Sequence, residues 1–387
     1  MQSEINIMTA GHVDHGKTTL VQAITGNKIS THSEELKRGI TIKLGYSDCV
    51  FYKSGGEYNS KKGEEVMRVS FLDAPGHETL MATVIAASSI VDGAVLVIAA
   101  NEKCPQAQTA EHLAVIEAAG IKQLIIAQNK IDLVDEKQAR QNYEEIKNFL
   151  KGTVYENTPI IPVSANTGVN VNYLIQAIVE NFKPVEKEGG EAVFYVARSF
   201  DVNKPRTKVD EIKGAVLGGS VVRGVLRVGD EIEILPGVAL KKKDREYYQP
   251  LETRIVEIEA GREKIDEARP GGLIGISTLL DPSLSKSDSL VGCVVGRKGS
   301  LPRPVSEVRM ILKPIQRSLV SFPPFTSGEL VVLGVGTATT LGFIKSQKKN
   351  DFIIELKKPV CVLPNQKISV MRRTQNRWHL YATGVSK

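Results

Sequence analysis

The chain changes its sequence periodicity once, near its middle, and this change constrains the fold more than any other feature. In the first half, helix-length segments alternate with short apolar runs. The apolar runs are residues 5–8, 69–72, 94–100, 124–127 and 160–163, and the helix-length segments are residues 106–119, 136–150 and 171–182. This alternation predicts an α/β domain with a mostly parallel, doubly wound sheet. Residues 46–52 form a further expected strand that has no crossover helix.

The second half lacks helical periodicity and contains short expected strands separated by glycine turns. The change follows residues 181–192, NFKPVEKEGGEA, whose proline, glycines and mixed charges are typical of a linker. A second break, near residues 296–307, divides the strands into two groups. Short strands at regular spacing favour closed barrels. We therefore predict an α/β domain of residues 1–187, followed by two β-barrel domains of residues 188–301 and 302–387.

Composition and charge narrow the class of protein. The 387 residues carry a net charge of +6, which permits a polyanionic partner without requiring one. Four separated cysteines, with no CxxC pair, indicate free thiols in a reducing cytoplasm. The N-terminus lacks a secretory signal pattern, and the most apolar run, residues 94–100, is far shorter than the ~20 residues that span a bilayer. We expect a cytoplasmic protein.

Residues 11–18, GHVDHGKT, fit G-x-x-x-x-G-K-[ST] between an expected strand and a helix-like stretch. The glycines let successive backbone N–H groups point into one concavity, and the helix N-terminus adds partial positive charge. A glycine turn without a ligand is the alternative, which the complete pattern in this setting disfavours. We expect the Lys17 ammonium to reach the terminal phosphates and the Thr18 hydroxyl to bind Mg²⁺. The residues assigned to the phosphates are Asp14, His15, Gly16, Lys17, Thr18 and Thr19.

The segment QNKID, residues 128–132, indicates which base the nucleotide carries. The Asp132 carboxylate accepts two parallel hydrogen bonds, which guanine N1–H and N2–H₂ donate and adenine does not. Asn129 offers a donor and an acceptor, and the aliphatic stem of Lys130 can lie along the base plane. The loop after the 160–163 strand is expected to offer backbone N–H groups to guanine O6, and its residues are Ser164, Ala165 and Asn166. GTP or GDP is therefore the expected ligand.

Two further stretches are expected to detect the γ-phosphate. In FLDAPGH, Asp73 suits a water-mediated contact to Mg²⁺, and the Gly76 N–H can approach the γ-phosphate because no Cβ intervenes. His77 then falls beside an attacking water, with a solvated loop histidine as the alternative. In RGITI, residues 38–42, Thr41 can complete the Mg²⁺ shell. A polar segment ordered by γ-phosphate and Mg²⁺ acts as a switch.

Phosphoryl transfer to water depends mainly on positioning and on neutralisation of charge. We expect Lys17 and Mg²⁺ to neutralise charge on the β- and γ-oxygens and His77 to orient the water. None of these motifs contains an obvious arginine finger, although Arg38 is a distant candidate. Intrinsic hydrolysis should therefore be slow until a partner completes the site.

These stretches together resemble the translational GTPases. GHVDHGKTT, RGITI, DAPGH, NKID and SAN occur in that family's order, and the two expected barrels match its three-domain plan. Within the family, the chain is most similar to the gamma subunits of archaeal and eukaryotic initiation factor 2. The stretches that carry this narrower resemblance are residues 99–134, 197–205 and 271–296.

The resemblance implies a function beyond what the residues alone indicate. Members carry methionylated initiator tRNA to the small ribosomal subunit in the GTP-bound state, and they form a heterotrimer with alpha and beta subunits. By motif position, the resemblance also implies the phosphate, Mg²⁺ and guanine residues given above, and it adds a metal-binding role for Asp14. Two alternatives are an elongation-type GTPase for a special aminoacyl-tRNA, such as selenocysteyl-tRNA, and a GTPase subunit that regulates a metabolic enzyme.

One segment departs from the family pattern. Many members insert a four-cysteine zinc knuckle between the first switch and the DxPG strand, whereas residues 45–68 here contain only Cys49. One thiolate cannot form a structural zinc site, so we expect no zinc and a polar loop at residues 52–65.

Basic runs interleaved with aromatic residues occur at residues 240–248 and 371–379. Such runs suit contacts with unpaired bases. A charge run is more often a solvated face, however, and Trp378 is equally suited to anchor a barrel core.

Overall fold

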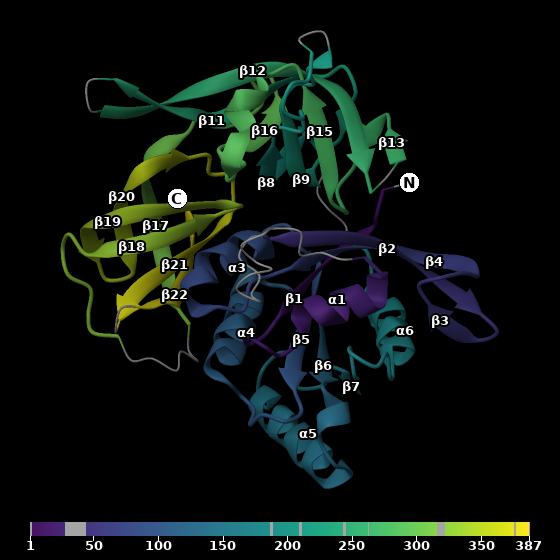
Figure 1. Ribbon diagram of the computed structural model, residues 1–387. Coiled ribbons are helices and arrows are strands. Elements are labelled where there is room, and N and C mark those ends of the chain that lie inside the picture. Colours follow the sequence, from purple (N-terminus) through teal and green to yellow (C-terminus); the bar gives the residue numbers. More distant parts are fainter. Residues whose placement is uncertain are drawn as a thin grey trace.

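The protein is described by a computed structural model covering residues 2–27, 44–185, 189–208, 211–242, 245–261, 263–315, 322–374 and 377–386. In the view of Figure 1 the first barrel lies above the α/β domain, and the second barrel, at the left, packs beside helices α3 and α4. The predicted fold class, an α/β domain followed by two barrels, is confirmed. Within the described residues, no helix combines the length and apolar character needed to cross a membrane.

The α/β domain is built on a seven-stranded sheet in the order β3-β2-β4-β1-β5-β6-β7. Strands β4, β1, β5, β6 and β7 are parallel, and β2 and β3 extend the sheet with antiparallel pairing. The strands are β1 Ile5–Ala10, β2 Gly45–Ser54, β3 Glu57–Asn59, β4 Glu64–Asp73, β5 Gly93–Ala99, β6 Gln123–Asn129 and β7 Ile160–Pro162. β1 and β5 are buried along their whole length, which explains their continuous apolar sequence.

Helices cover both faces of this sheet. They are α1 Lys17–Thr25, α3 Met81–Ser88, α4 Ala107–Ala119, α5 Glu136–Leu150 and α6 Val171–Asn181, with short 3₁₀ turns η1 Glu78–Leu80 and η2 Ile131–Leu133. α5 begins where predicted because Asp135 and Gln138 form a capping box. α3 was not predicted, because MATVIAAS is apolar on most sides and shows no clear period.

The first barrel consists mainly of six strands that close through the pairing of β11 with β12. Its elements are β8 Val193–Phe200, β9 Val216–Arg223, β10 Leu226–Arg227, β11 Glu231–Lys242, β12 Arg245–Ala260, β13 Glu263–Ile265, β14 Glu267–Ala268, β15 Ile274–Thr278, η4 Pro282–Asp288 and β16 Val294–Arg297. The β11–β12 hairpin extends beyond the barrel at the top of Figure 1.

The second barrel closes in the order β17-β20-β19-β18-β21-β22. Its strands are β17 Val305–Pro314, β18 Leu330–Val335, β19 Ala338–Lys348, β20 Asp351–Val360, β21 Lys367–Thr374 and β22 Arg377–Ser386. In β17, buried Val308, Met310 and Leu312 alternate with exposed residues, as a barrel wall requires. The predicted limits at 187/188 and 301/302 stay predictions.

The prediction of a polar loop at residues 52–65 is wrong in part. β2 continues to Ser54, β3 pairs with it, and β4 begins at Glu64. Glycines at positions 55 and 56, both with positive φ, make the tight turn between β2 and β3. The segment is therefore a hairpin extension of the sheet.

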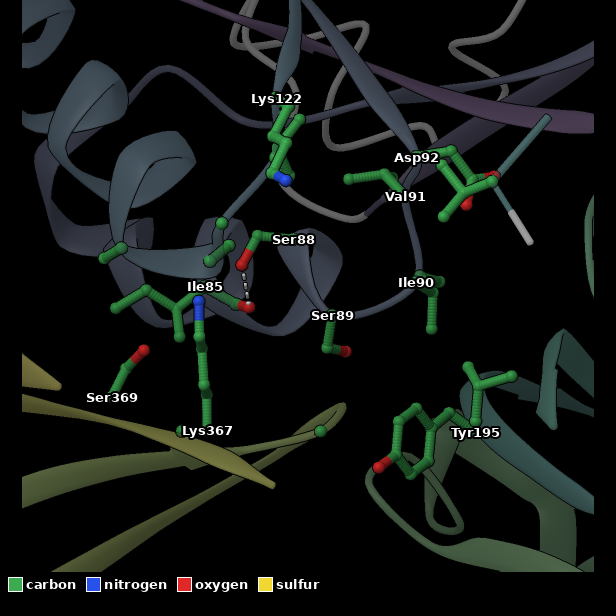
Figure 2. A pocket seen from close by; sticks show the side chains of 18 of the residues that line it. Ile85, Ser88, Ser89, Ile90, Val91, Asp92, Lys122, Tyr195, Lys367 and Ser369 are labelled. Atoms are coloured by element: carbon green, nitrogen blue, oxygen red, sulfur yellow. Dashed lines mark hydrogen bonds between the residues drawn. The ribbon is translucent and has the colours of Figure 1, made fainter. Parts of the chain in front are cut away.

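The three bodies meet around a cavity of about 650 Å³ (Figure 2). Tyr195 enters it from the first barrel, Lys367 and Ser369 from the second, and Ser88 and Lys122 from the α/β domain. The Lys367 ammonium lies against Gly120, the residue that ends α4. A cation is favourable there because the helix C-terminus carries partial negative charge.

Candidate nucleotide-binding site

The phosphate loop joins β1 to α1 and depends on two glycines. Gly11 has φ +133°, and a Cβ there would lie 2.2 Å from the carbonyl oxygen of Val97. Gly16 has φ +85° and caps α1, and its Cβ would lie 2.5 Å from the side-chain nitrogen of Asn129. Both positions therefore require glycine for backbone conformation and for space.

Lys17 is the buried cation of the loop, with 6% of its surface exposed. Its ammonium donates to the carbonyl oxygens of His12 at 2.7 Å and Gly11 at 3.1 Å. Burial lowers the pKa of Lys17 to about 8, although the carboxylates of Asp73 and Asp14 act in the opposite direction.

Gly76 packs directly against the loop. A Cβ at Gly76 would lie 2.3 Å from the Lys17 ammonium nitrogen and 3.0 Å from the Val13 backbone nitrogen. The DAPGH segment and the phosphate loop are thus brought together, as the sequence predicts.

Thr18 and Asp73 bring two oxygen donors to the same place. The Thr18 hydroxyl donates to one carboxylate oxygen of Asp73 at 2.5 Å, and the Thr9 hydroxyl donates to the other at 2.8 Å. Asp73 is fully buried at the end of β4. Hydroxyl and carboxylate oxygens are the donors that Mg²⁺ prefers, so this pair fits that ion.

Asn129 ties the phosphate loop to the SAN loop. Its amide nitrogen donates to the carbonyl oxygen of His15 at 2.9 Å, and its amide oxygen accepts from the Ala165 N–H at 3.0 Å. The Ala165 N–H is engaged by Asn129 in this structure, and the assignment of the SAN-loop N–H groups to guanine O6 stays a prediction. Asn129 is a brace between the two loops.

The other guanine candidates lie at the same edge of the sheet, some exposed and one buried. Lys130 has φ +63°, and Asp132 is exposed in η2 directly after β6. Ser164 is buried, and its hydroxyl accepts from the Thr167 N–H at 3.3 Å, while Asn166 is exposed. Asp14, with φ +61°, and Thr19 are exposed on the phosphate loop and α1.

His77 caps η1, and its described contacts are with Thr79. Its Nδ1 lies 2.9 Å from the Thr79 hydroxyl and accepts weakly from the Thr79 N–H. His77 directly follows Gly76, which packs against the phosphate loop, and this brings it near that loop in space. Thr41 and Arg38 lie outside the described residues.

Two histidines have roles that the motif did not predict. The His15 ring points inward, with Nδ1 3.1 Å from the Val97 carbonyl oxygen and Nε2 3.3 Å from a Glu102 carboxylate oxygen. Burial lowers its pKa. His15 can therefore offer the loop only its backbone. The second histidine, His112 of α4, accepts the Gly11 N–H at 2.8 Å, and its signal in the sequence is a histidine at a core-facing helix position.

Arg198 connects the α/β domain to the first barrel. It donates to the carbonyl oxygen of Leu44 at 3.0 Å and to Asp288 at 2.9 Å, and its guanidinium lies 5.0 Å from the Phe200 ring centroid. A cavity of about 390 Å³ lies beside these groups, between β2 and the barrel.

The basic run at residues 371–379 is largely engaged within the protein. Arg372 is 3% exposed and binds Glu329 through two hydrogen bonds. The Trp378 side chain packs against the core that includes α4, and His379 lies 2.8 Å from a Glu111 carboxylate oxygen. This favours the core role for Trp378. The other run, residues 240–248, lies on the β11–β12 hairpin.

No group of three or more His, Cys, Asp or Glu side chains in the described part of the chain gathers as a metal site. The four cysteines are buried, and Cys49 lies in β2. The expectation of no zinc stays a prediction.

Comparison with known proteins agrees with this geometry. Residues 2–184 match the Elongation factor Tu GTP binding domain, residues 214–296 match Elongation factor Tu domain 2, and residues 307–386 match Initiation factor eIF2 gamma, C terminal. Translation initiation factor 2 subunit gamma from Methanocaldococcus jannaschii is 49% identical over 99% of this chain and 97% of its own. The Pyrococcus furiosus protein of that name is 46% identical over 100% of this chain and 98% of its own.

Solved structures show the same architecture. A bacterial selenocysteine-specific elongation factor superposes with a TM-score of 0.77 at 26% identity, and this chain spans 58% of its length. Elongation factor SelB from Methanococcus maripaludis, bound to a GTP analogue, superposes with a TM-score of 0.75 at 22% identity. At this level of identity, the SelB structure supports a shared fold only.

The fold and the phosphate loop define a translational GTPase. Identity of almost half the residues over almost the whole length narrows the class further. The chain belongs to the family of translation initiation factor 2 gamma subunits.

Proposed function

We propose that this chain binds GTP with Mg²⁺ and, in that state, carries methionylated initiator tRNA to the small ribosomal subunit in the cytoplasm. It does so as the core of a heterotrimer with alpha and beta subunits, and it hydrolyses GTP to GDP and phosphate. The observation that supports the proposal is the convergence of the phosphate loop, Asp73 and Asn129 at one edge of the sheet.

The phosphates and Mg²⁺ are held by groups of this edge. Mg²⁺, when bound, neutralises charge on the β- and γ-oxygens. Thr18, Asp73 and Thr41 would hold it, with Asp14 as a further ligand. The loop N–H groups of residues 14–19 and the Lys17 ammonium bind the phosphates, and the Gly76 N–H meets the γ-phosphate. His77 orients the attacking water.

Guanine is recognised by the exposed Asp132 carboxylate. Lys130 and Asn166 line the base, Asn129 joins the phosphate loop to Ala165, and Ser164 shapes its own loop through Thr167. In calorimetry, GTP should bind strongly and ATP should not. Asp132→Asn should remove this preference, because the variant amide repels one guanine donor. Equal binding of ATP and GTP by the wild type would contradict the proposal.

The 390 Å³ cavity suits the esterified end of the tRNA. Its walls include Leu44, Phe200 and Ile274, and Tyr46, which is 51% exposed, borders it. A methionyl side chain is apolar and adapts to such walls, and a terminal adenine can stack on an aromatic ring. Leu44 follows the segment that contains Thr41, and Arg198 holds its carbonyl oxygen. This places the cavity where the nucleotide state can affect it.

An initiation role is favoured over elongation because residues 307–386 match the C-terminal family of the gamma subunit. Filter binding with a non-hydrolysable GTP analogue should retain charged initiator tRNA in preference to charged elongator tRNA and uncharged initiator tRNA. Retention should fall with GDP. Phe200→Ala should weaken it, whereas Tyr173→Ala, on the exposed face of α6, should not. No preference for any tRNA would favour a regulatory GTPase subunit of a metabolic enzyme.

A further inference from the structure

His112 is a fully buried histidine on α4 that reaches the start of the phosphate loop. Its Nδ1 accepts the Gly11 backbone N–H at 2.8 Å. The Gly11 carbonyl oxygen, on the same residue, accepts from the Lys17 ammonium at 3.1 Å. A chain of two hydrogen bonds therefore links α4 to the cation expected to bind the phosphates.

The chemical state of the ring follows from this contact. Nδ1 can accept only when it carries no proton, so the proton of a neutral ring lies on Nε2. Burial lowers the pKa of His112 to about 3, and the nearby Lys17 charge acts in the same direction, so the neutral form is maintained. Nε2 has no hydrogen-bond partner among the described residues.

An unpartnered buried polar nitrogen is unfavourable, so a purely structural position would favour an apolar side chain. A histidine at this position is explained by its Nδ1 atom, which accepts the Gly11 N–H. Gly11 has a backbone conformation that other residues rarely adopt and no room for a Cβ, so no side chain of its own can brace it. A support for this peptide must come from another element.

Helix α4 is a suitable support because it is fixed on several sides. The adjacent residue Glu111 contacts His379 of β22, and Lys367 of β21 lies against the helix end. Leu113 and Ile116 are buried in the core shared with the barrels. The ring of His112 is therefore held by the packing of the second barrel as well as by the α/β domain.

We propose that His112 is a positioning residue that fixes the first peptide of the phosphate loop and thereby slows the release of bound nucleotide. The proposal rests on the nucleotide site assigned above. Because Gly11 supports Lys17, loss of the acceptor should affect GDP and GTP alike.

The test compares His112→Asn with His112→Leu in the full chain. Asparagine places an acceptor oxygen at the same bond separation from Cβ as Nδ1, whereas leucine fills the space without an acceptor. Thr109→Val is the matched control, since Thr109 is also buried on α4 and its hydroxyl has no partner among the described residues. The measurement is dissociation of a fluorescent GDP analogue, at a temperature well below the unfolding midpoint of every variant.

We expect His112→Leu to release GDP about tenfold faster, with His112→Asn and Thr109→Val within about twofold of the wild type. Equal release by the Leu variant and the wild type would overturn the proposal. If the Leu variant does not fold, ¹⁵N NMR of the wild-type ring decides: a proton on Nδ1 overturns the proposal and a proton on Nε2 supports it. Failure of the wild type to bind either nucleotide would instead remove the proposed function.

Discussion

The Thr18 hydroxyl donates to the Asp73 carboxylate across 2.5 Å, although the two residues lie 55 positions apart in the chain. The contact arises because β1 and β4 are parallel neighbours, with Thr9 paired to Asp73 in register. α1 begins a few residues after β1 and β4 ends at Asp73, so both side chains emerge at the same sheet edge. In parallel sheets this carboxyl edge is where ligands bind.

The Thr18–Asp73 pair should make nucleotide binding depend on Mg²⁺. Asp73→Asn keeps one acceptor for the hydroxyls but removes the negative charge that attracts the ion. We expect the gain in GDP affinity on adding Mg²⁺ to fall by tenfold or more, with binding in EDTA little changed. Asp92→Asn is the control, because Asp92 is also buried but accepts from the Asn6 N–H elsewhere. An equal Mg²⁺ response in wild type and Asp73→Asn would contradict this assignment.

Replacing Lys17 by methionine should stabilise the protein in the absence of nucleotide while abolishing nucleotide binding. A pKa lowered from 10.5 to about 8 corresponds to about 3 kcal/mol of unfavourable burial at neutral pH. Loss of two hydrogen bonds to carbonyl oxygens offsets about 2 kcal/mol of this, leaving a net gain near 1 kcal/mol.

The direction in which pH changes the folding stability tests this prediction for Lys17. Between pH 8 and 10.5 the unfolded chain binds more protons than the folded one, so wild-type stability from this group rises with pH. The advantage of Lys17→Met should shrink over that interval in urea unfolding experiments. An advantage that stays constant from pH 7 to 10 would show that burial of the charge is not its cause.

Arg372 should be a strong contributor to the stability of the second barrel. It forms two hydrogen bonds to Glu329, donates to the Pro323 carbonyl oxygen, and lies 3.9 Å from the Phe325 ring centroid. Arg372→Met should lower the free energy of unfolding by about 3 kcal/mol, because it leaves Glu329 partly buried without its partner. Arg309→Met, which breaks a pair whose arginine is 59% exposed, should leave it little changed, because solvent screens the pair. Similar losses in thermal unfolding of the two variants would contradict the prediction.

His77→Ala should depress ribosome-stimulated GTP hydrolysis while nucleotide affinity stays near that of the wild type. The ring contacts η1, and no described contact links it to the phosphate loop, so its removal should leave the binding groups in place. Single-turnover hydrolysis, measured with and without ribosomal subunits, together with GDP titration, separates the two effects. Unchanged stimulated turnover would exclude His77 from the mechanism.

Much of the fold followed from the sequence because it depends on local patterns. The continuous apolar runs marked β1, β5 and β6, and the helix-length segment of residues 136–150 marked α5. The motifs marked the phosphate loop, since glycine spacing and the adjacent lysine are local properties of the chain. Short elements such as α3 and β3 have no clear sequence period, so local patterns did not predict them.

The partners of individual side chains were decided only by the tertiary structure. Asn129 braces His15 and Ala165, His112 reaches Gly11 from α4, and Arg372 turns into its barrel instead of facing solvent. These contacts join residues up to 114 positions apart or place a charge inside a barrel. The packing of strands and helices sets such distances, and the periodicity of a single sequence carries no information about them.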